Sequence, residues 1–144
     1  MKPYPHHYEV STVGAPTGPL TFSSPGLPDR EADSPPEFDG PGGYWSPETL
    51  LMAALANCLT LTWRSVAAHN KFTWNGLRVE VTGVLDRVDR VARFTEVQAI
   101  FHLTVPEDAD DEVAERLAHK TESVCLISNS LSATKSIELR LTRA

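Results

Sequence analysis

Residues 46–63 read SPETLLMAALANCLTLTW and predict the long apolar helix around which the fold is built. Ser46 can cap this helix, and Pro47 suits its first position because the N–H that proline lacks is not needed there. Glu48 places a negative charge near the positive end of the helix dipole. We expect the helix to run over residues 46–69, which corresponds to a rise of about 35 Å.

Apolar side chains cover most of the circumference of this central helix, which is typical of a helix buried on nearly all sides. A domain of 144 residues can hardly surround such a helix by itself. We therefore expect a homodimer in which the second subunit covers one side of the helix. The apolar positions are Leu50, Leu51, Ala54, Leu55, Cys58, Leu59, Leu61, Trp63 and Val66.

The segment before the helix predicts a ragged pair of strands within residues 6–24 and a long loop over residues 24–45. Tyr8 and Val10 alternate with polar residues, and a Pro/Gly-rich turn over residues 14–18 separates the two strands. The loop is rich in Pro, Gly, Asp and Glu. A loop of this length is either a functional lid or a solvated surface excursion.

After the helix the hydrophobic period changes to two. Residues 77–85 and 95–105 predict long strands joined by a solvated charged turn at residues 86–93, and residues 137–141 predict a closing strand. The predicted class is α+β, with a strongly bent antiparallel sheet and a central helix. We expect a single domain over residues 1–144.

Two further helices are expected between the last two strands. Asp108 or Asp110 caps the first of them, which runs through His119. Ser123 can cap a second, short helix that carries Cys125.

Charge and composition exclude several classes of protein. The formal net charge is −6, whereas a nucleic-acid-binding protein would carry clustered Lys and Arg on one face. The start, MKPYPHHYEV, has no apolar core behind a basic end, and we expect no later stretch to be long and apolar enough to span a bilayer. The five histidines lack partners at metal-ligand spacing, so we expect no metal and no cofactor. We expect a cytoplasmic protein with no nucleic-acid or membrane partner.

The sequence contains two cysteines, Cys58 within the central helix and Cys125 within ESVCLISNSL. Free cysteines are among the residues most often buried, so an inert apolar role is one interpretation of Cys58. In a reducing compartment, two distant cysteines are more typical of catalysis or of inert packing than of a structural disulfide. Together the two thiols could carry a complete redox cycle.

Four stretches carry a family resemblance that covers about residue 40 to the C-terminus. They are GPGGYWSPETLLMAALANCLTLTW (40–63), LRVEVTGVLDRV (77–88), RFTEVQAIFHLTVP (93–106) and ESVCLISNSLSATKSIEL (122–139). In combination they resemble the OsmC/Ohr family of thiol-dependent peroxidases.

The resemblance implies an OsmC-like fold in a tightly intertwined homodimer, and it implies a role for each of three residues. Cys58 matches the cysteine that attacks an organic hydroperoxide, Cys125 the cysteine that resolves the product to a disulfide, and Glu48 the carboxylate that orients an arginine. A dithiol reductant, either dihydrolipoyl or thioredoxin-like, would recycle the disulfide.

The reduction of a hydroperoxide by a thiol requires these residue types. A thiolate attacks the O–O bond, and an ordinary cysteine with a pKa of about 8.5 is mostly protonated at neutral pH. We expect a cation beside Cys58, whose position in mid-helix gives it no help from a helix N-terminus. The sulfenic acid that forms must meet a second thiol before irreversible over-oxidation. Cys125, in the first turn of its helix, is expected to be partly ionised.

The expected cation departs from the family pattern. Family members carry an arginine upstream of the helix, but the early hairpin VGAPTGPLTF (13–22) has no basic residue. Arg30 is the candidate, with Arg93 or Arg64 as alternatives. Glu48 has a second interpretation as a dipole partner only, and ten helical positions, about 15 Å, separate it from Cys58. It can serve the same site only through an arginine or from the partner subunit.

Three functions remain open from the sequence. The first is a two-cysteine peroxidase that reduces organic hydroperoxides to alcohols. The second is a catalytically silent dimer that binds a hydrophobic molecule in a groove lined by Trp45, Trp63 and Phe38. The third is a thiol redox sensor.

Overall fold

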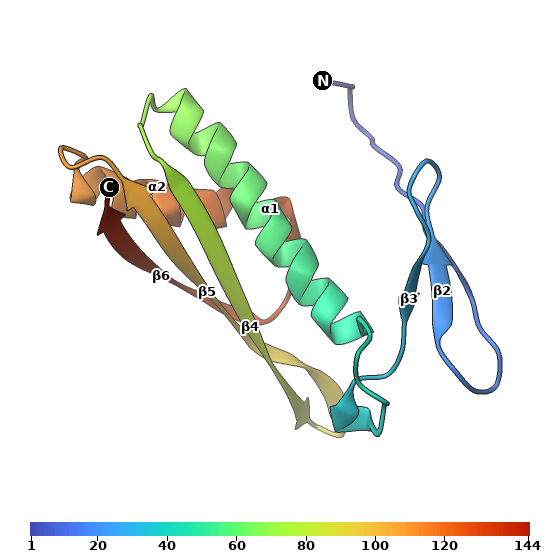
Figure 1. Cartoon of the computed structure of the whole chain (residues 1–144). Coiled ribbons are helices and arrows are strands. Elements are labelled where there is room, and N and C mark those ends of the chain that lie inside the picture. The colour runs from blue at the N-terminus through green and yellow to red at the C-terminus, as the bar shows by residue number, and fades with distance from the viewer. The chain divides into compact units, whose positions relative to one another are not determined.

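A computed structural model describes residues 1–144 (Figure 1). The chain consists of two compact units, residues 1–51 and 52–144. Helix α1 (Pro47–His69) begins in the first unit and continues in the second. The single domain expected over the whole chain stays a prediction.

The first unit contains a three-stranded antiparallel sheet in the order β1-β2-β3. Strands β1 (Ser11–Val13) and β2 (Leu20–Ser23) confirm the predicted pair, but Tyr8 and Val10, on whose alternation the first strand was predicted, lie before β1. The predicted loop is interrupted by β3 (Arg30–Ala32) and by the 3-10 helix η1 (Pro36–Phe38). The short β3 forms despite its loop-like composition because its backbone pairs with β2 and its last residue is buried.

Helix α1 has the predicted bounds and the predicted cap. The Ser46 hydroxyl accepts a hydrogen bond from the Thr49 N–H at 3.2 Å, and the Thr49 hydroxyl accepts one from the Ser46 N–H at 2.8 Å. This reciprocal pair satisfies two backbone donors at the helix start.

Within this chain, α1 is buried along one stripe and not on nearly all sides. Leu55, Leu59, Trp63 and Ala67 are buried at intervals of four residues, whereas Leu61 is 57% exposed. The apolar circumference predicted from the sequence is therefore only partly covered by the chain itself.

By length and composition, α1 could cross a membrane, which differs from the expectation that no stretch is apolar enough. The core helix of a soluble protein can have the same length and apolar composition.

The second unit contains a three-stranded sheet in the order β4-β5-β6, made of β4 (Gly76–Val88), β5 (Val91–Val105) and β6 (Thr134–Arg143). The α+β class is confirmed, but the sheet is mixed, because β4 and β5 are antiparallel while β5 and β6 are parallel. Two helices return the chain between β5 and β6, and such a crossover lets the two strands run the same way.

The β4–β5 hairpin is longer than predicted because its turn needs only two residues. Asp89 and Arg90 have φ values of 51° and 69°, the left-handed conformation that matches the twist of a tight hairpin. The charged stretch that surrounds them continues both strands.

The two returning helices are α2 (Asp111–Val124) and α3 (Leu126–Asn129). Asp110 caps α2, as expected, by accepting a hydrogen bond from the Val113 N–H at 3.1 Å. The expectation that Ser123 caps the short helix is wrong, because Ser123 lies in the last turn of α2 and Cys125 occupies the cap of α3.

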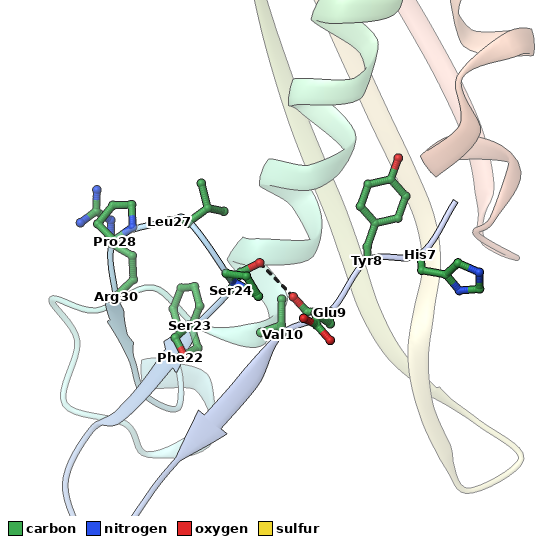
Figure 2. A pocket seen from close by; sticks show the side chains of 11 residues that line it. His7, Tyr8, Glu9, Val10, Phe22, Ser23, Ser24, Leu27, Pro28 and Arg30 are labelled. Carbon is green, nitrogen blue, oxygen red and sulfur yellow. Dashed lines mark hydrogen bonds between the residues drawn. The ribbon is translucent and has the colours of Figure 1, made fainter. Parts of the chain in front are cut away.

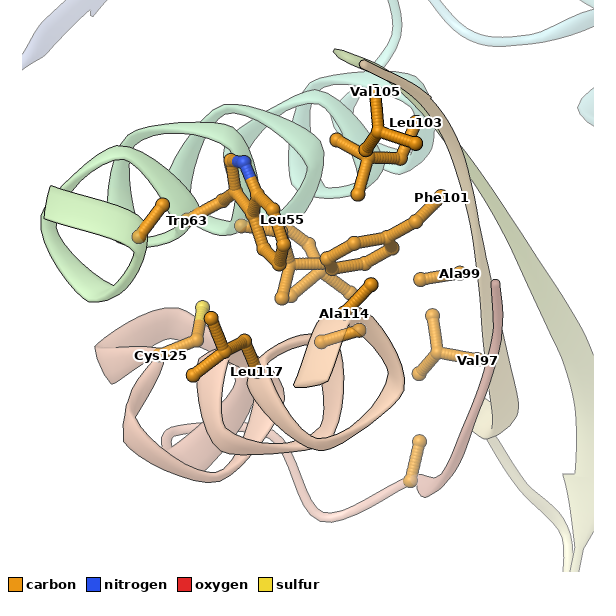
Figure 3. Close-up of a cluster of buried hydrophobic side chains, with 14 residues drawn as sticks. Leu55, Trp63, Val97, Ala99, Phe101, Leu103, Val105, Ala114, Leu117 and Cys125 are labelled. Atoms are coloured by element: carbon orange, nitrogen blue, oxygen red, sulfur yellow. The ribbon is translucent and has the colours of Figure 1, made fainter. Parts of the chain in front are cut away.

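Side chains of α1, α2 and one face of β5 meet in a single hydrophobic core (Figure 3). Alternate residues of β5 face this core, in agreement with the period of two. Trp63 lies at its centre, with its ring edge-to-face against Phe72, Trp74 and Phe101 at 5.9–6.4 Å between centroids. This core fixes α1 relative to the α2–α3 junction, and the two cysteines lie on these elements.

Candidate active site

The structure brings together the two thiols that are 67 residues apart in the sequence. The Cys125 thiol donates a hydrogen bond to Cys58 Sγ, with 2.9 Å between the two sulfur atoms. Both cysteines are free thiols. This is the geometry of a reduced pair that can become a disulfide with small movements.

The two thiols differ in access. Cys125 has no solvent exposure, whereas Cys58 is only partly buried. A reagent from solvent would therefore meet Cys58 first, and Cys125 lies behind it. Figure 3 shows Cys125 beside the buried side chains of the core.

The α2–α3 junction holds Cys125 in place through its backbone and its sulfur. The Cys125 N–H donates to the Glu122 carbonyl at 3.2 Å, and Cys125 Sγ accepts from the Ser128 N–H at 3.5 Å. Sulfur thus takes the place of the oxygen that usually caps a helix.

The surroundings of Cys58 favour its thiolate. Burial by itself would raise the pKa of Cys58, but hydrogen bonds from the Cys125 thiol, the Ile127 backbone amide, Thr62 and the Leu126 amide outweigh burial and lower this pKa. The two amides belong to the first residues of α3, so the start of a second helix helps to stabilise the Cys58 thiolate. The expectation that no helix N-terminus would do so is therefore wrong.

The surroundings of Cys125 have the opposite effect. Burial, followed by the hydrogen bond that its thiol gives to Cys58, raises the pKa of Cys125 to about 11. The expectation that Cys125 is partly ionised is therefore wrong, because it rested on a nearby helix start and took no account of burial.

Thr62 and Ser128 were missed by the sequence analysis. The Thr62 hydroxyl lies 3.8 Å from Cys58 Sγ, one helical turn further along α1. The spacing of four residues in a helix was a signal that could have identified Thr62. No sequence signal pointed to Ser128, which is recognisable only by its burial beside Cys125.

Glu48 and Arg30 lie in the first unit, and their proposed roles stay predictions. Glu48 Oε2 is buried and has no hydrogen-bond partner within this chain. Arg30, in β3, donates to the Asp29 carbonyl at 3.4 Å and is exposed. The two alternatives, Arg64 and Arg93, are exposed as well.

A cavity of about 1040 Å³ lies within the first unit and is open to solvent (Figure 2). Arg30 lines this cavity together with Tyr8, Phe22 and Leu27, and no cysteine lines it. The predicted groove of Trp45, Trp63 and Phe38 is wrong in one member, because Trp63 is fully buried in the core.

The molecule thus combines a mixed α+β fold with two free thiols that face each other. Residues 40–140 match the model of the family of OsmC-like proteins, and the chain belongs to this family. The family resemblance predicted from the sequence is thereby confirmed.

Three relatives illustrate the likeness. The uncharacterized protein YmaD of Bacillus subtilis is 25% identical over 108 residues, which are 73% of this chain and 72% of YmaD. An OsmC-like protein of unknown function from Vibrio cholerae has a structure with a TM-score of 0.85 and 16% identity over 94% of this chain and 99% of its own. An organic hydroperoxide resistance protein OsmC from Legionella pneumophila has a TM-score of 0.73 and 23% identity over 95% of this chain and 97% of its own.

Proposed function

We propose that this protein is a two-cysteine thiol peroxidase that reduces organic hydroperoxides to alcohols. Family membership and the likeness to an organic hydroperoxide resistance protein support a role in hydroperoxide resistance in general. The observation that carries the specific proposal is the separation of 2.9 Å between Cys58 Sγ and Cys125 Sγ.

In the first step the Cys58 thiolate attacks the outer oxygen of a hydroperoxide. The O–O bond breaks, sulfur is oxidised to a sulfenic acid, and the alkoxide leaves and takes up a proton to become the alcohol. The lowered pKa of Cys58 favours the thiolate that this step needs, and the partial exposure of Cys58 leaves it open to substrate.

In the second step the Cys125 thiol attacks the sulfenic sulfur of Cys58. An S–S bond forms, the S–O bond breaks, and the hydroxide leaves as water with the proton from Cys125. In the reduced pair, the raised pKa of Cys125 keeps its thiol protonated as the donor to Cys58 Sγ. A small dithiol, dihydrolipoyl or thioredoxin-like, then reduces the disulfide by thiol–disulfide exchange.

Glu48 and Arg30 belong to this proposal as an activating pair. The carboxylate oxygen of Glu48 that is buried without a partner is a natural acceptor for a guanidinium, because a buried charge is costly without one. We assign that guanidinium to Arg30, whose charge would support the thiolate and the leaving alkoxide.

We also propose that the protein is a cytoplasmic homodimer. The exposed apolar positions of α1, such as Leu61, are the surface that a second subunit would cover. Sedimentation at low micromolar concentration should show a dimer, and a stable folded monomer would contradict this part of the proposal.

The peroxidase proposal is tested by adding cumene hydroperoxide to the reduced protein. One equivalent should be consumed per chain, and the intact mass should fall by about two hydrogens as the disulfide forms within one chain. Excess dithiol should sustain turnover. Added oxygen in place of the lost hydrogens would show that Cys125 does not resolve the sulfenic acid.

A further inference from the structure

Glu122, at the end of α2, is bonded twice to the turn that carries Cys125. Its backbone carbonyl accepts the Cys125 N–H at 3.2 Å. Its carboxylate Oε1 accepts the Ser128 hydroxyl at 2.6 Å. One residue therefore ties both ends of the segment 125–128 to α2.

Ser128 passes this constraint on to the thiol. Its N–H donates to Cys125 Sγ at 3.5 Å, while its hydroxyl is held by Glu122. Neither Glu122 nor Ser128 forms a hydrogen bond with Cys58, so any influence on the chemistry has to act through Cys125.

The surroundings make the Glu122–Ser128 hydrogen bond strong. Ser128 is 1% exposed, and the small hollow beside it is lined by apolar side chains such as Leu55, Leu59 and Val97 and also by Glu122, Lys135 and Ser136. A hydroxyl-to-carboxylate hydrogen bond of this length is charge-assisted, and a low local dielectric strengthens it. Loss of the Glu122 carboxylate would leave the buried Ser128 hydroxyl without this acceptor.

We propose that Glu122 is a positioning residue that, through Ser128, holds the Cys125 thiol against Cys58 for disulfide formation. This inference rests on the proposed peroxidase function. The sulfenic acid on Cys58 has two fates: the Cys125 thiol converts it to a disulfide and water, or a second hydroperoxide converts it to a sulfinic acid and an alcohol. The first fate wins only while the thiol stays in position.

The test measures how the sulfenic acid divides between these fates. Glu122→Ala and Ser128→Ala are treated with increasing cumene hydroperoxide, and the ratio of sulfinic acid to disulfide is measured by intact mass. We expect this ratio to rise about tenfold at a given peroxide concentration, which corresponds to about 1.4 kcal/mol in the barrier of resolution. The ratio does not depend on the rate of the first oxidation.

Matched variants separate positioning from general loosening of the fold. Glu122→Gln keeps an oxygen that can accept the Ser128 hydroxyl, and it should restore most of the wild-type ratio. Glu115→Ala, on an exposed turn of the same helix, and Ser123→Ala, whose exposed hydroxyl bonds to the Lys120 carbonyl, should leave the ratio unchanged. If Ser128→Ala does not fold, Glu122→Ala and Glu122→Asp carry the test.

A wild-type ratio in folded Glu122→Ala would overturn the inference and leave the peroxidase proposal intact. If the wild type consumes no hydroperoxide, the peroxidase proposal fails, and the same variants are compared with diamide, which accepts two electrons and two protons as the disulfide forms. About tenfold slower disulfide formation in Glu122→Ala would then still support positioning, and an equal rate would overturn it.

Discussion

Cys58 and Cys125 are the same chemical group, and their sulfur atoms lie 2.9 Å apart, yet their surroundings make them different acids. Cys58 receives hydrogen bonds from a thiol, a hydroxyl and two backbone amides, and its pKa is lowered. Cys125 is fully buried and donates that hydrogen bond, and both effects raise its pKa, to about 11. Burial is the largest influence on both thiols and raises both pKa values, and the shared hydrogen bond then lowers the pKa of Cys58 and raises that of Cys125 further.

The same contrast assigns a division of labour. The accessible group with the lowered pKa suits attack on a substrate from solvent. The buried group suits a later step inside the protein because its sulfur contacts Cys58 and has no exposure to solvent. The predictions below test this contrast.

The largest expected effect is complete loss of turnover in Cys58→Ser. Serine is nearly isosteric, so the fold should survive at a cost of about 1–3 kcal/mol for a poorly solvated hydroxyl. Peroxide consumption with excess dithiol measures the loss, and circular dichroism checks the fold. Full turnover in this variant would end the peroxidase proposal.

Cys125→Ser is the matched partner of that variant and should react once. It should stop at a Cys58 sulfenic acid that a dimedone-type reagent labels and that excess peroxide drives to the sulfinic acid. If both serine variants behaved alike, the contrast between the two cysteines would be wrong.

The next expected effect is on the acidity of Cys58. Cys125→Ala removes the donor to the thiolate, and this donor is the strongest of the hydrogen bonds that lower the pKa of Cys58, so that pKa should rise. Cys125→Ser keeps a donor and should change this pKa less. The rate of Cys58 alkylation as a function of pH measures both values.

The sign of this pH dependence follows from the lowered pKa. In the wild type, alkylation of Cys58 should reach half its maximum below the pH at which free cysteine does, about 8.5. In Cys125→Ala the midpoint should move to higher pH. An identical midpoint in both proteins would show that the shared hydrogen bond does not activate Cys58.

Much of the fold could be predicted because its signals are local. The cap at Ser46, the apolar run of α1 and the period of two in β4 and β5 are all visible in short windows of sequence. The prediction that β6 is antiparallel to its neighbour was wrong, because hydrophobic alternation indicates which face of a strand is buried and not in which direction the strand runs.

The candidate site could be predicted only in part. Nothing local links Cys58 to a residue 67 positions away, and the pairing came from the family resemblance. Cys125 as the cap of α3 was missed because the rules for helix starts favour the hydroxyl of Ser123 over a thiol. The prediction that Cys125 is partly ionised was wrong, because the pKa of Cys125 depends on its burial by α1 and the core, which cannot be seen in a short window of sequence.

The smallest expected effect concerns Arg30. The thiol of Cys125 and the amides of α3 already lower the pKa of Cys58, so an additional cation should contribute about 1 kcal/mol, and Arg30→Ala should slow the first oxidation about fivefold. Stopped-flow oxidation with cumene hydroperoxide measures this step, and Arg64→Ala is the matched control. If Arg30 acts through Glu48, Glu48→Gln should give the same loss and the double variant no more, because residues in one network are not additive. A larger loss in Arg64→Ala than in Arg30→Ala, or the wild-type rate in all four variants, would exclude Arg30 and leave the Cys125 thiol and the α3 amides as the groups that activate Cys58.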